Sequence, residues 1–320
     1  MTKVKVAVVQ TASVMFDTPA TLDAMESWVQ RAADEGAKLA VFPEAYIGGY
    51  PKGLDFGTRI GIREAEGRAM FRRYFNAAIT LDGPEVDRIA GLARAHSIRL
   101  VVGAIERKGS SLYCTVLFFS PEGHLTDIHR KLMPTGAERL VWAQGDGSTL
   151  PVLDTEIGKL GAVICWENYM PTLRAAMYAQ GIEIYCAPTV DDRDTWQTAM
   201  RHIGYEGRVF VLAACQYLTR GDIPFADYPS GLGDAPETVL IRGGSVIISP
   251  MGEVLAGPLF NAEGLVCAEI DLEDLPLGRY DLDVSGHYAR PDVLSLRVDT
   301  TPRSAVHFVT EEDAPEAPAD

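Results

Sequence analysis

Three reactive side chains stand where apolar runs of the sequence end. Cys165 follows the run "KLGAVI", Glu44 follows "LAVFP", and Lys131 lies in "IHRKLMP". In α/β proteins, ligands bind beyond the carboxyl ends of the strands, so the three side chains could meet at one site. A nearby cation lowers the pKa of a thiol, and the thiolate is the nucleophile. The pattern is therefore compatible with nucleophilic catalysis by cysteine.

Position alone leaves other interpretations open. A lone cysteine that ends an apolar run is more often a packed core residue, and a lysine at a strand end is more often a surface charge. Glu44 fits a solvated loop carboxylate as well as a general base. His129 alternates with Lys131 and would point to the same face of a strand, where a structural, hydrogen-bonded histidine is the more common case.

Other chemical motifs are weak or absent. Cys114, Cys186, Cys215 and Cys267 lie in apolar strands without the C-x-x-C spacing of a metal site, and five is an odd number, so we expect reduced thiols in a cytoplasmic protein. The run "DDRD" at 191–194 indicates a solvated turn rather than a metal site. The sequence has no G-x-G-x-x-G, P-loop or G-x-S-x-G motif.

Composition excludes several classes of protein. The net charge of −15 disfavours binding to nucleic acid or to anionic membranes. No apolar stretch approaches the roughly 18 residues of a membrane helix, and the N-terminus has no signal-peptide pattern. With 47% hydrophobic residues, the chain can bury a large core. We expect a soluble, cytoplasmic protein.

The spacing of apolar residues predicts strands alternating with helices. Helices are expected from a cap at Thr18 to Gly36, over 84–96, over 171–181 and over 195–207, with short apolar strands between them. The two halves repeat the same order, which suggests a diverged duplication. Short, continuously apolar strands are buried in sheets covered by helices, so two facing sheets with helices outside are expected.

Three segments do not follow this alternation of strands and helices. Residues 54–76 are charged and contain glycine, and 221–238 form a long loop rich in proline and glycine. Residues 310–320 are acidic and lack any apolar period, so we expect a mobile tail after a single domain over 1–309.

The strongest stretches together resemble one family. They are "AVFPEAYIGGYPKG", "HRKLMPTGAERLVWAQGDGSTLPV", "GAVICWENYMPTLRAAMYAQGIEIYCAPT" and "DTWQTAMRHIGYEGRVFVLAACQ". The sequence resembles the carbon–nitrogen hydrolase (nitrilase) superfamily from "VAVVQTA" to "VCAEIDL". "CWE" is the form found in true nitrilases, and other stretches resemble nitrilases of plants, cyanobacteria and bacteria. The resemblance implies an α/β fold, a four-layer α-β-β-α sandwich.

The resemblance also implies roles for particular residues. The family's catalytic triad corresponds to Glu44, Lys131 and Cys165, and a second family glutamate to Glu138, which would orient substrate or hold Lys131. The implied reaction converts a small-molecule nitrile to the carboxylic acid and ammonia through a thioimidate and a thioester, with some amide as by-product. It requires no metal and no organic cofactor.

Four further residues lie in or beside these motifs. Tyr50, Trp166, Val190 and Trp196 would form a wall suited to an aryl or arylalkyl nitrile, although Trp196 more simply packs its helix. Relatives often carry alanine in place of Val190. The alternatives are an amidase or N-carbamoyl hydrolase on the same scaffold, and a non-catalytic assembly protein that kept the fold.

The family further implies a homo-oligomer built from dimers, which can extend into a helical spiral. Helices 171–181 and 195–207 would supply the dimer surface, with Met177, Tyr178 and His202 as candidate contacts. Segments 54–76 and 221–238 are candidates for additional contacts. A contact that does not close into a ring produces a filament.

Overall fold

The apolar runs of the sequence form strands, and the amphipathic runs between them form helices. The computed structural model describes residues 3–225, 228, 231, 233–304 and 306. Residues 310–320 lie outside the described residues. The division into a domain over 1–309 and a tail therefore stays a prediction.

Most of the chain between residues 3 and 279 lies in regular elements. The strands are β1 (Lys3–Gln10), β2 (Leu39–Val41), β3 (Thr58–Arg59), β4 (Ile62–Arg63), β5 (Arg99–Lys108), β6 (Ser111–Phe119), β7 (Leu125–Arg130), β8 (Val152–Thr155), β9 (Gly158–Ala162), β10 (Ile184–Thr189), β11 (Phe210–Cys215), β12 (Tyr217–Thr219), β13 (Val239–Ile248), β14 (Val254–Phe260) and β15 (Gly264–Asp271). The α-helices are α1 (Thr18–Asp34), α2 (Ala65–Ala77), α3 (Pro84–His96), α4 (Pro171–Ala179), α5 (Asp194–Gly207) and α6 (Asp274–Arg279). Short 3₁₀ turns are η1 (Gly136–Leu140), η2 (Gly147–Thr149), η3 (Cys165–Tyr169) and η4 (Arg220–Asp222).

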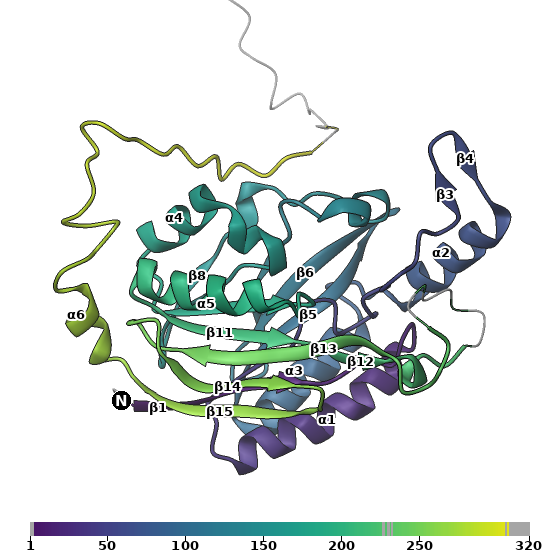
Figure 1. Ribbon diagram of the computed structural model, residues 1–320, viewed down its shortest axis with the longest axis horizontal. Coiled ribbons are helices and arrows are strands. Elements are labelled where there is room, and N and C mark those ends of the chain that lie inside the picture. Colours follow the sequence, from purple (N-terminus) through teal and green to yellow (C-terminus); the bar gives the residue numbers. More distant parts are fainter. Residues whose placement is uncertain (1–2, 226–227, 229–230, 232, 305, 307–320) are drawn as a thin grey trace, which may run out of the picture.

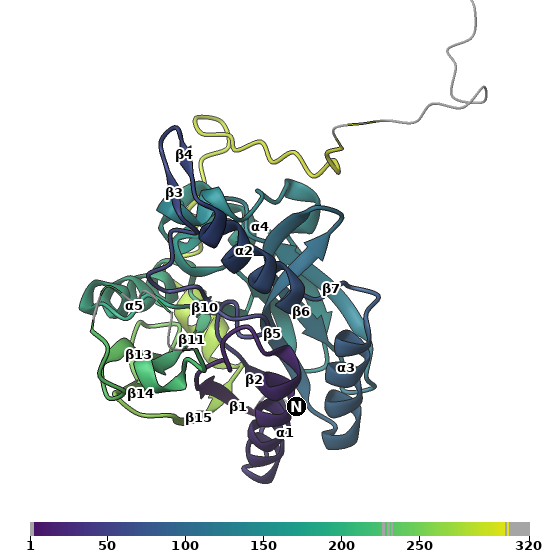
Figure 2. The ribbon, with the colours of Figure 1, turned by 90° about the vertical axis from the view of Figure 1, so that its right-hand side faces the viewer.

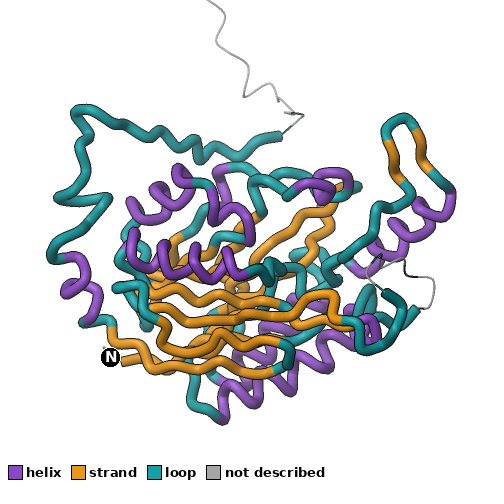
Figure 3. The backbone as a smooth tube through the Cα atoms, viewed as in Figure 1, coloured by secondary structure: helices purple, strands orange, loops and turns teal. Residues whose placement is uncertain are grey.

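Two large sheets carry the fold (Figures 1 and 3). Among the described residues, one sheet has six strands in the order β15-β1-β2-β5-β6-β7. The other has seven, in the order β12-β13-β11-β10-β9-β8 with β14 on β13. Each sheet contains three neighbouring parallel strands: β1, β2 and β5 in the first, and β9, β10 and β11 in the second. The two halves of the chain therefore share a layout, as the sequence predicts.

The apolar side chains form three packed layers. Val6 and Ile184 belong to the cluster between the two sheets. Met25 and Ile89 pack α1 and α3 on the outer face of the first sheet, and Met200 packs α5 on the outer face of the second. Figure 2 shows α1 and α3 on the opposite side of the strands from α5. The predicted four-layer α-β-β-α sandwich is confirmed.

Some predicted details are wrong. Asp17 caps α1, because its carboxylate accepts the N–H of Ala20 at 3.0 Å, whereas the buried Thr18 hydroxyl donates to the carbonyl of Ala77. Strand β7 ends at Arg130 rather than at Leu132, so Lys131 lies just beyond the strand.

Two of the proposed dimer contacts are also wrong. Met177 is fully buried and Tyr178 is 7% exposed, because both pack beneath α4 in the outer core of the second sheet. The His202 side chain is 60% exposed and Tyr205 is 48% exposed. On α5, these two residues face away from the core.

The irregular segments lie at the periphery. Within 54–76, strands β3 and β4 form a small hairpin followed by α2, and this unit projects from the body of the molecule (Figure 1). Residues 280–304 form no helix or strand and run past α4 toward η2, where Asp146 accepts the N–H of Arg303 at 2.8 Å. None of the helices in the described part of the chain is long and apolar enough to cross a membrane.

Candidate active site

Cys165 stands in a tight turn between β9 and α4. Its φ angle of 49° is in the left-handed region, which costs a residue with a Cβ roughly 1–3 kcal/mol. The Asn168 side-chain amide donates to the carbonyls of Val163 and Cys165, at 2.9 and 2.8 Å, and so holds the turn. The Thr189 hydroxyl donates to the Cys165 Sγ at 3.2 Å. The turn thus presents the thiol at the end of the strand, as the sequence suggests.

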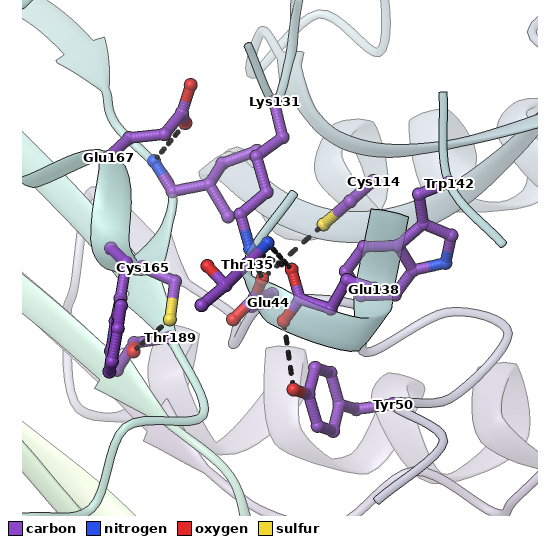
Figure 4. Close-up of polar contacts among 12 residues, drawn as sticks. Glu44, Tyr50, Cys114, Lys131, Thr135, Glu138, Trp142, Cys165, Glu167 and Thr189 are labelled. Carbon is purple, nitrogen blue, oxygen red and sulfur yellow. Dashed lines mark hydrogen bonds and ion pairs between the residues drawn. The ribbon is translucent and has the colours of Figure 1, made fainter. Parts of the chain in front are cut away.

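Lys131 joins two carboxylates beside this thiol (Figure 4). Its Nζ donates to Glu44 Oε1 at 2.6 Å and to Glu138 Oε2 at 2.8 Å. The side chains of Lys131 and Glu44 are fully buried. Glu44 follows β2, Lys131 follows β7, and Cys165 follows β9, so the end of each sheet contributes to one cluster.

Glu138 is fixed from two further directions. The Tyr50 hydroxyl donates to its Oε1 at 2.9 Å, and the Thr135 N–H donates to its Oε2 at 2.6 Å. The carboxylate holds Lys131 and also borders the cavity above Cys165. This position is compatible with both of the roles that the sequence leaves open.

A cavity of about 240 Å³ opens over the cluster. The side chains that line it are Tyr50, Lys52, Thr135, Glu138, Cys165, Trp166, Val190, Asp191, Asp192 and Arg193. Trp196, proposed with Tyr50, Trp166 and Val190 as a substrate contact, does not line this cavity. It is fully buried below α5 and packs edge-to-face on Tyr169, with 6.0 Å between ring centroids.

The mouth of the cavity carries charges that sequence reasoning missed. Asp191 is 7% exposed rather than in a solvated turn, and its Oδ2 accepts the indole N–H of Trp166 at 2.8 Å. Arg193 pairs with Asp191 and lies over the Trp166 ring at 4.7 Å. The signal that could have revealed Asp191 is its place just beyond Val190, at the end of the fully buried strand β10.

The electrostatics of the site favour a protonated thiol before substrate binds. Burial raises the pKa of Cys165, Glu44 raises it further, and the opposing effect of Lys131 is smaller. The expectation of a lowered thiol pKa is therefore wrong for the site without substrate. Burial also raises the pKa of Glu44, against the opposing charge of Lys131.

Lys131 remains a cation in this setting. Burial disfavours its charged form, but the negative charges around it, chiefly Glu44, outweigh that effect and hold the pKa of Lys131 well above its usual value. The site therefore contains a permanent positive charge between a thiol and two carboxylates. Such an arrangement can stabilise negative charge that develops during a reaction.

Three other buried groups lie next to the cluster. The carboxylate of Glu167, within "CWEN", accepts hydrogen bonds beside both Cys165 and Lys131. His129 contacts Glu167 and is a structural, hydrogen-bonded histidine, as expected. The Cys114 thiol lies 3.7 Å from Glu44 Oε1, although its strand position gave no sign of this. Among the described residues, no group of three or more His, Cys, Asp or Glu side chains is arranged to hold a metal ion.

Comparison with known proteins agrees with this geometry. Residues 5–280 match the carbon-nitrogen hydrolase family model. A nitrilase of Bradyrhizobium diazoefficiens is 55% identical over 96% of this chain and 95% of its own length. A bifunctional nitrilase/nitrile hydratase of Nicotiana tabacum is 54% identical over 96% of this chain and 89% of its own length.

The fold also matches solved structures. The Caenorhabditis elegans NitFhit protein superposes with a TM-score of 0.73 at 21% identity, covering 95% of this chain and 69% of that protein. At this identity the match supports the shared fold alone. The family match and the two relatives confirm the resemblance found in the sequence, and the chain belongs to the carbon–nitrogen hydrolase family.

Proposed function

We propose that this protein hydrolyses a small organic nitrile to the carboxylic acid and ammonia through a covalent intermediate on Cys165. The observation that carries the proposal is the position of the Lys131 ammonium. It donates hydrogen bonds to Glu44 and Glu138, next to the Cys165 thiol that lines the cavity. The two relatives above are named as nitrilases, and each is more than 50% identical over nearly the full chain.

The first step begins with a neutral thiol. Glu44 takes the proton of Cys165 as Sγ bonds to the nitrile carbon, and one π bond of the C≡N group breaks. The nitrogen then receives that proton from Glu44, which leaves a neutral thioimidate. Glu44 Oε2 suits this exchange, because it is buried and has no hydrogen-bond partner among the described residues.

Two molecules of water complete the reaction. Glu44 takes a proton from the first water as its oxygen adds to the thioimidate carbon. Glu44 passes this proton to the nitrogen, which gives a tetrahedral intermediate with one OH and one NH₂ group. Glu44 then carries the hydroxyl proton to the nitrogen, the C–N bond breaks, ammonia leaves and the C=O bond of the thioester forms. Glu44 takes a proton from a second water as its oxygen adds to the thioester carbon, the C–S bond breaks, the acid leaves, and Glu44 returns the proton to Sγ. Lys131, with the Trp166 backbone N–H as a second donor, would stabilise the tetrahedral intermediates.

Loss of sulfur in place of ammonia would release an amide. That branch accounts for the by-product that we expect, and the relative from Nicotiana tabacum is named for both activities. Glu138 would keep Lys131 oriented throughout, because it is hydrogen-bonded to Tyr50 and to the Thr135 N–H as well.

Substrate preference follows from the cavity walls. Tyr50, Trp166 and Val190 line the cavity and suit an aryl or arylalkyl nitrile. Ammonia release from a panel of aromatic, arylaliphatic and aliphatic nitriles tests this proposal, with Cys165→Ala as the control. Turnover of amides or N-carbamoyl compounds alone would favour the alternative enzyme classes, and no turnover of any of them would favour a non-catalytic assembly protein.

We further infer a cytoplasmic homo-oligomer built from dimers, with a spiral as a possible extension. The exposed side of α5, which carries His202 and Tyr205, is the candidate dimer surface. The projecting hairpin β3–β4 and the described part of 221–238 are candidates for further contacts. Light scattering across a dilution series tests the point, since a fully active monomer would refute it and dimers alone would remove only the spiral.

A further inference from the structure

Two buried groups beside the active site have no part in the proposed chemistry. The side chains of His129 and Glu167 are fully buried, and His129 Nε2 lies 3.0 Å from Glu167 Oε2. His129 is in β7, in the first sheet, whereas Glu167 is in the η3 turn that follows strand β9 of the second sheet. The pair therefore joins the two sheets directly behind the site.

Glu167 is bonded to the peptides next to both reactive groups. Its Oε1 accepts the N–H of Leu132 at 2.7 Å, and Leu132 follows Lys131. Its Oε2 accepts the N–H of Ile164 at 2.9 Å, and Ile164 precedes Cys165. One carboxylate thus connects the backbone that carries the cation to the backbone that carries the nucleophile.

The hydrogen bonds of His129 define its charge. Its Nδ1 lies 2.6 Å from the carbonyl oxygen of Thr149, which can only accept. Its Nε2 faces a carboxylate oxygen, which also accepts. Both ring nitrogens must therefore donate, and a ring with two N–H groups is an imidazolium. Burial lowers the pKa of His129, but Glu167 and the Thr149 carbonyl outweigh it and raise the pKa.

We infer that Glu167, held by the His129 imidazolium, is a positioning residue that fixes the distance between Lys131 and Cys165. The inference rests on the proposed function only for the roles of those two groups. Glu167 touches neither the cavity nor the substrate space above it. Its effect on the reaction passes through the two backbone segments that it joins. Figure 4 shows Glu167 above Cys165 and to the left of Lys131.

Replacing Glu167 by glutamine tests this geometry with little change in shape. Glutamine has one oxygen and one NH₂ group, and the NH₂ would face either Leu132 N–H or Ile164 N–H, which are both donors. At least one of the two segments then loses its acceptor. Because a shift of about 1 Å in a reacting group costs on the order of 100-fold in rate, we expect kcat to fall by about 10- to 100-fold with KM nearly unchanged.

The matched control is Glu106→Gln. Glu106 is also buried and pairs with a neighbour of Lys131, since the Arg130 guanidinium donates to it at 2.6 and 2.7 Å. It accepts nothing from the backbone of the catalytic turns. Glu106→Gln should lower the melting temperature and leave the rate per active site unchanged, whereas Glu167→Gln should lower that rate even in the fully folded fraction.

The reactivity of the Cys165 thiol can be measured without any nitrile substrate. The rate of Cys165 alkylation by iodoacetamide, read by intact mass with Cys165→Ala as the blank, should fall in Glu167→Gln and in His129→Gln but not in Glu106→Gln. The double variant Glu167→Gln/His129→Gln should lose little more than the more affected single variant, because the two residues act as one unit. These alkylation rates test the positioning role of Glu167 even if the wild-type protein releases no ammonia from nitriles.

The wild-type protein supplies a test that requires no variant to fold. After labelling with ¹⁵N-histidine, the ring of His129 should show two protonated nitrogens at pH 7.5. Full alkylation rate and full kcat per site in Glu167→Gln, or a neutral His129 ring at that pH, would overturn the inference.

Discussion

Glu44 and Glu167 are both buried carboxylates beside Cys165 and Lys131, but their surroundings differ. Glu167 accepts two backbone N–H groups and faces the His129 imidazolium, so both of its oxygens are occupied. Glu44 accepts from Lys131 at one oxygen, and among the described residues the other has no partner. A fully hydrogen-bonded carboxylate has no free oxygen with which to take a proton, whereas the free oxygen and raised pKa of Glu44 suit it to exchange protons. The bonding of each oxygen, rather than burial, therefore separates the base from the positioning group.

Removal of the nucleophile is expected to have the largest effect. Cys165→Ala should abolish ammonia release and leave the fold intact, because neither carboxylate can replace the thiol. Circular dichroism and ammonia release on the same samples provide the check. An active, folded Cys165→Ala protein would make the difference between the two carboxylates irrelevant to function.

Removal of charge from the cluster ranks next. Glu44→Gln keeps the shape and loses the base, and Lys131→Gln loses the cation, so each should lower kcat by about 100-fold or more. This is a larger loss than we expect for Glu167→Gln. Steady-state kinetics of the three variants decide the order, and a Glu44→Gln enzyme that outperforms Glu167→Gln would reverse our assignment of roles.

The two tryptophans beside the site should separate binding from stability. Trp166→Phe removes the hydrogen bond to Asp191 at the cavity mouth, and we expect a few-fold change in KM for aryl nitriles at nearly constant stability. Trp196→Phe shrinks a fully buried side chain and should lower the unfolding free energy by about 1–3 kcal/mol. Equal changes in KM for both variants would show that Trp196 reaches the substrate after all.

The smallest effect is a pH dependence of stability. The pKa of His129 is raised in the folded protein, so its ion pair contributes fully below the unfolded value of 6.5 and is lost as pH rises through the folded pKa. The difference in unfolding free energy between the wild type and His129→Gln, measured in urea, should therefore be constant below pH 6.5 and shrink as the pH rises above 6.5 toward the folded pKa. A difference that grows with pH would mean that the ring is neutral in the folded state.

The sequence predicts the sandwich because its signals are local. Continuous apolar runs, Pro171 at a helix start and the alternating order of elements define the sheets and their covering helices. The position of Cys165 at a strand end is also a local signal, because the apolar run stops directly before it. Glu44, Lys131 and Glu138 could be assigned roles only through the family resemblance, because their meeting depends on how the sheets face each other.

Other parts of the site depend on contacts that no local pattern contains. The role of Glu167 requires hydrogen bonds to Leu132 and to His129. These two residues lie in and just after β7 of the first sheet, whereas Glu167 follows a strand of the second. The sequence predicts a solvated turn at Asp191 because its partner Trp166 is distant in the sequence and meets it only in the folded chain. Trp196 was a plausible wall residue by its neighbours in sequence, but its helix turns it toward the core.

The central claim is that Glu44 transfers protons for a nucleophilic Cys165. Intact-mass spectrometry and ammonia release, recorded together after mixing with a good nitrile substrate, test it most directly. The account predicts a transient adduct and rapid ammonia release in the wild type, neither in Cys165→Ala, and strongly slowed adduct formation and ammonia release in Glu44→Gln. An adduct in Cys165→Ala, or wild-type rates in Glu44→Gln, would contradict it.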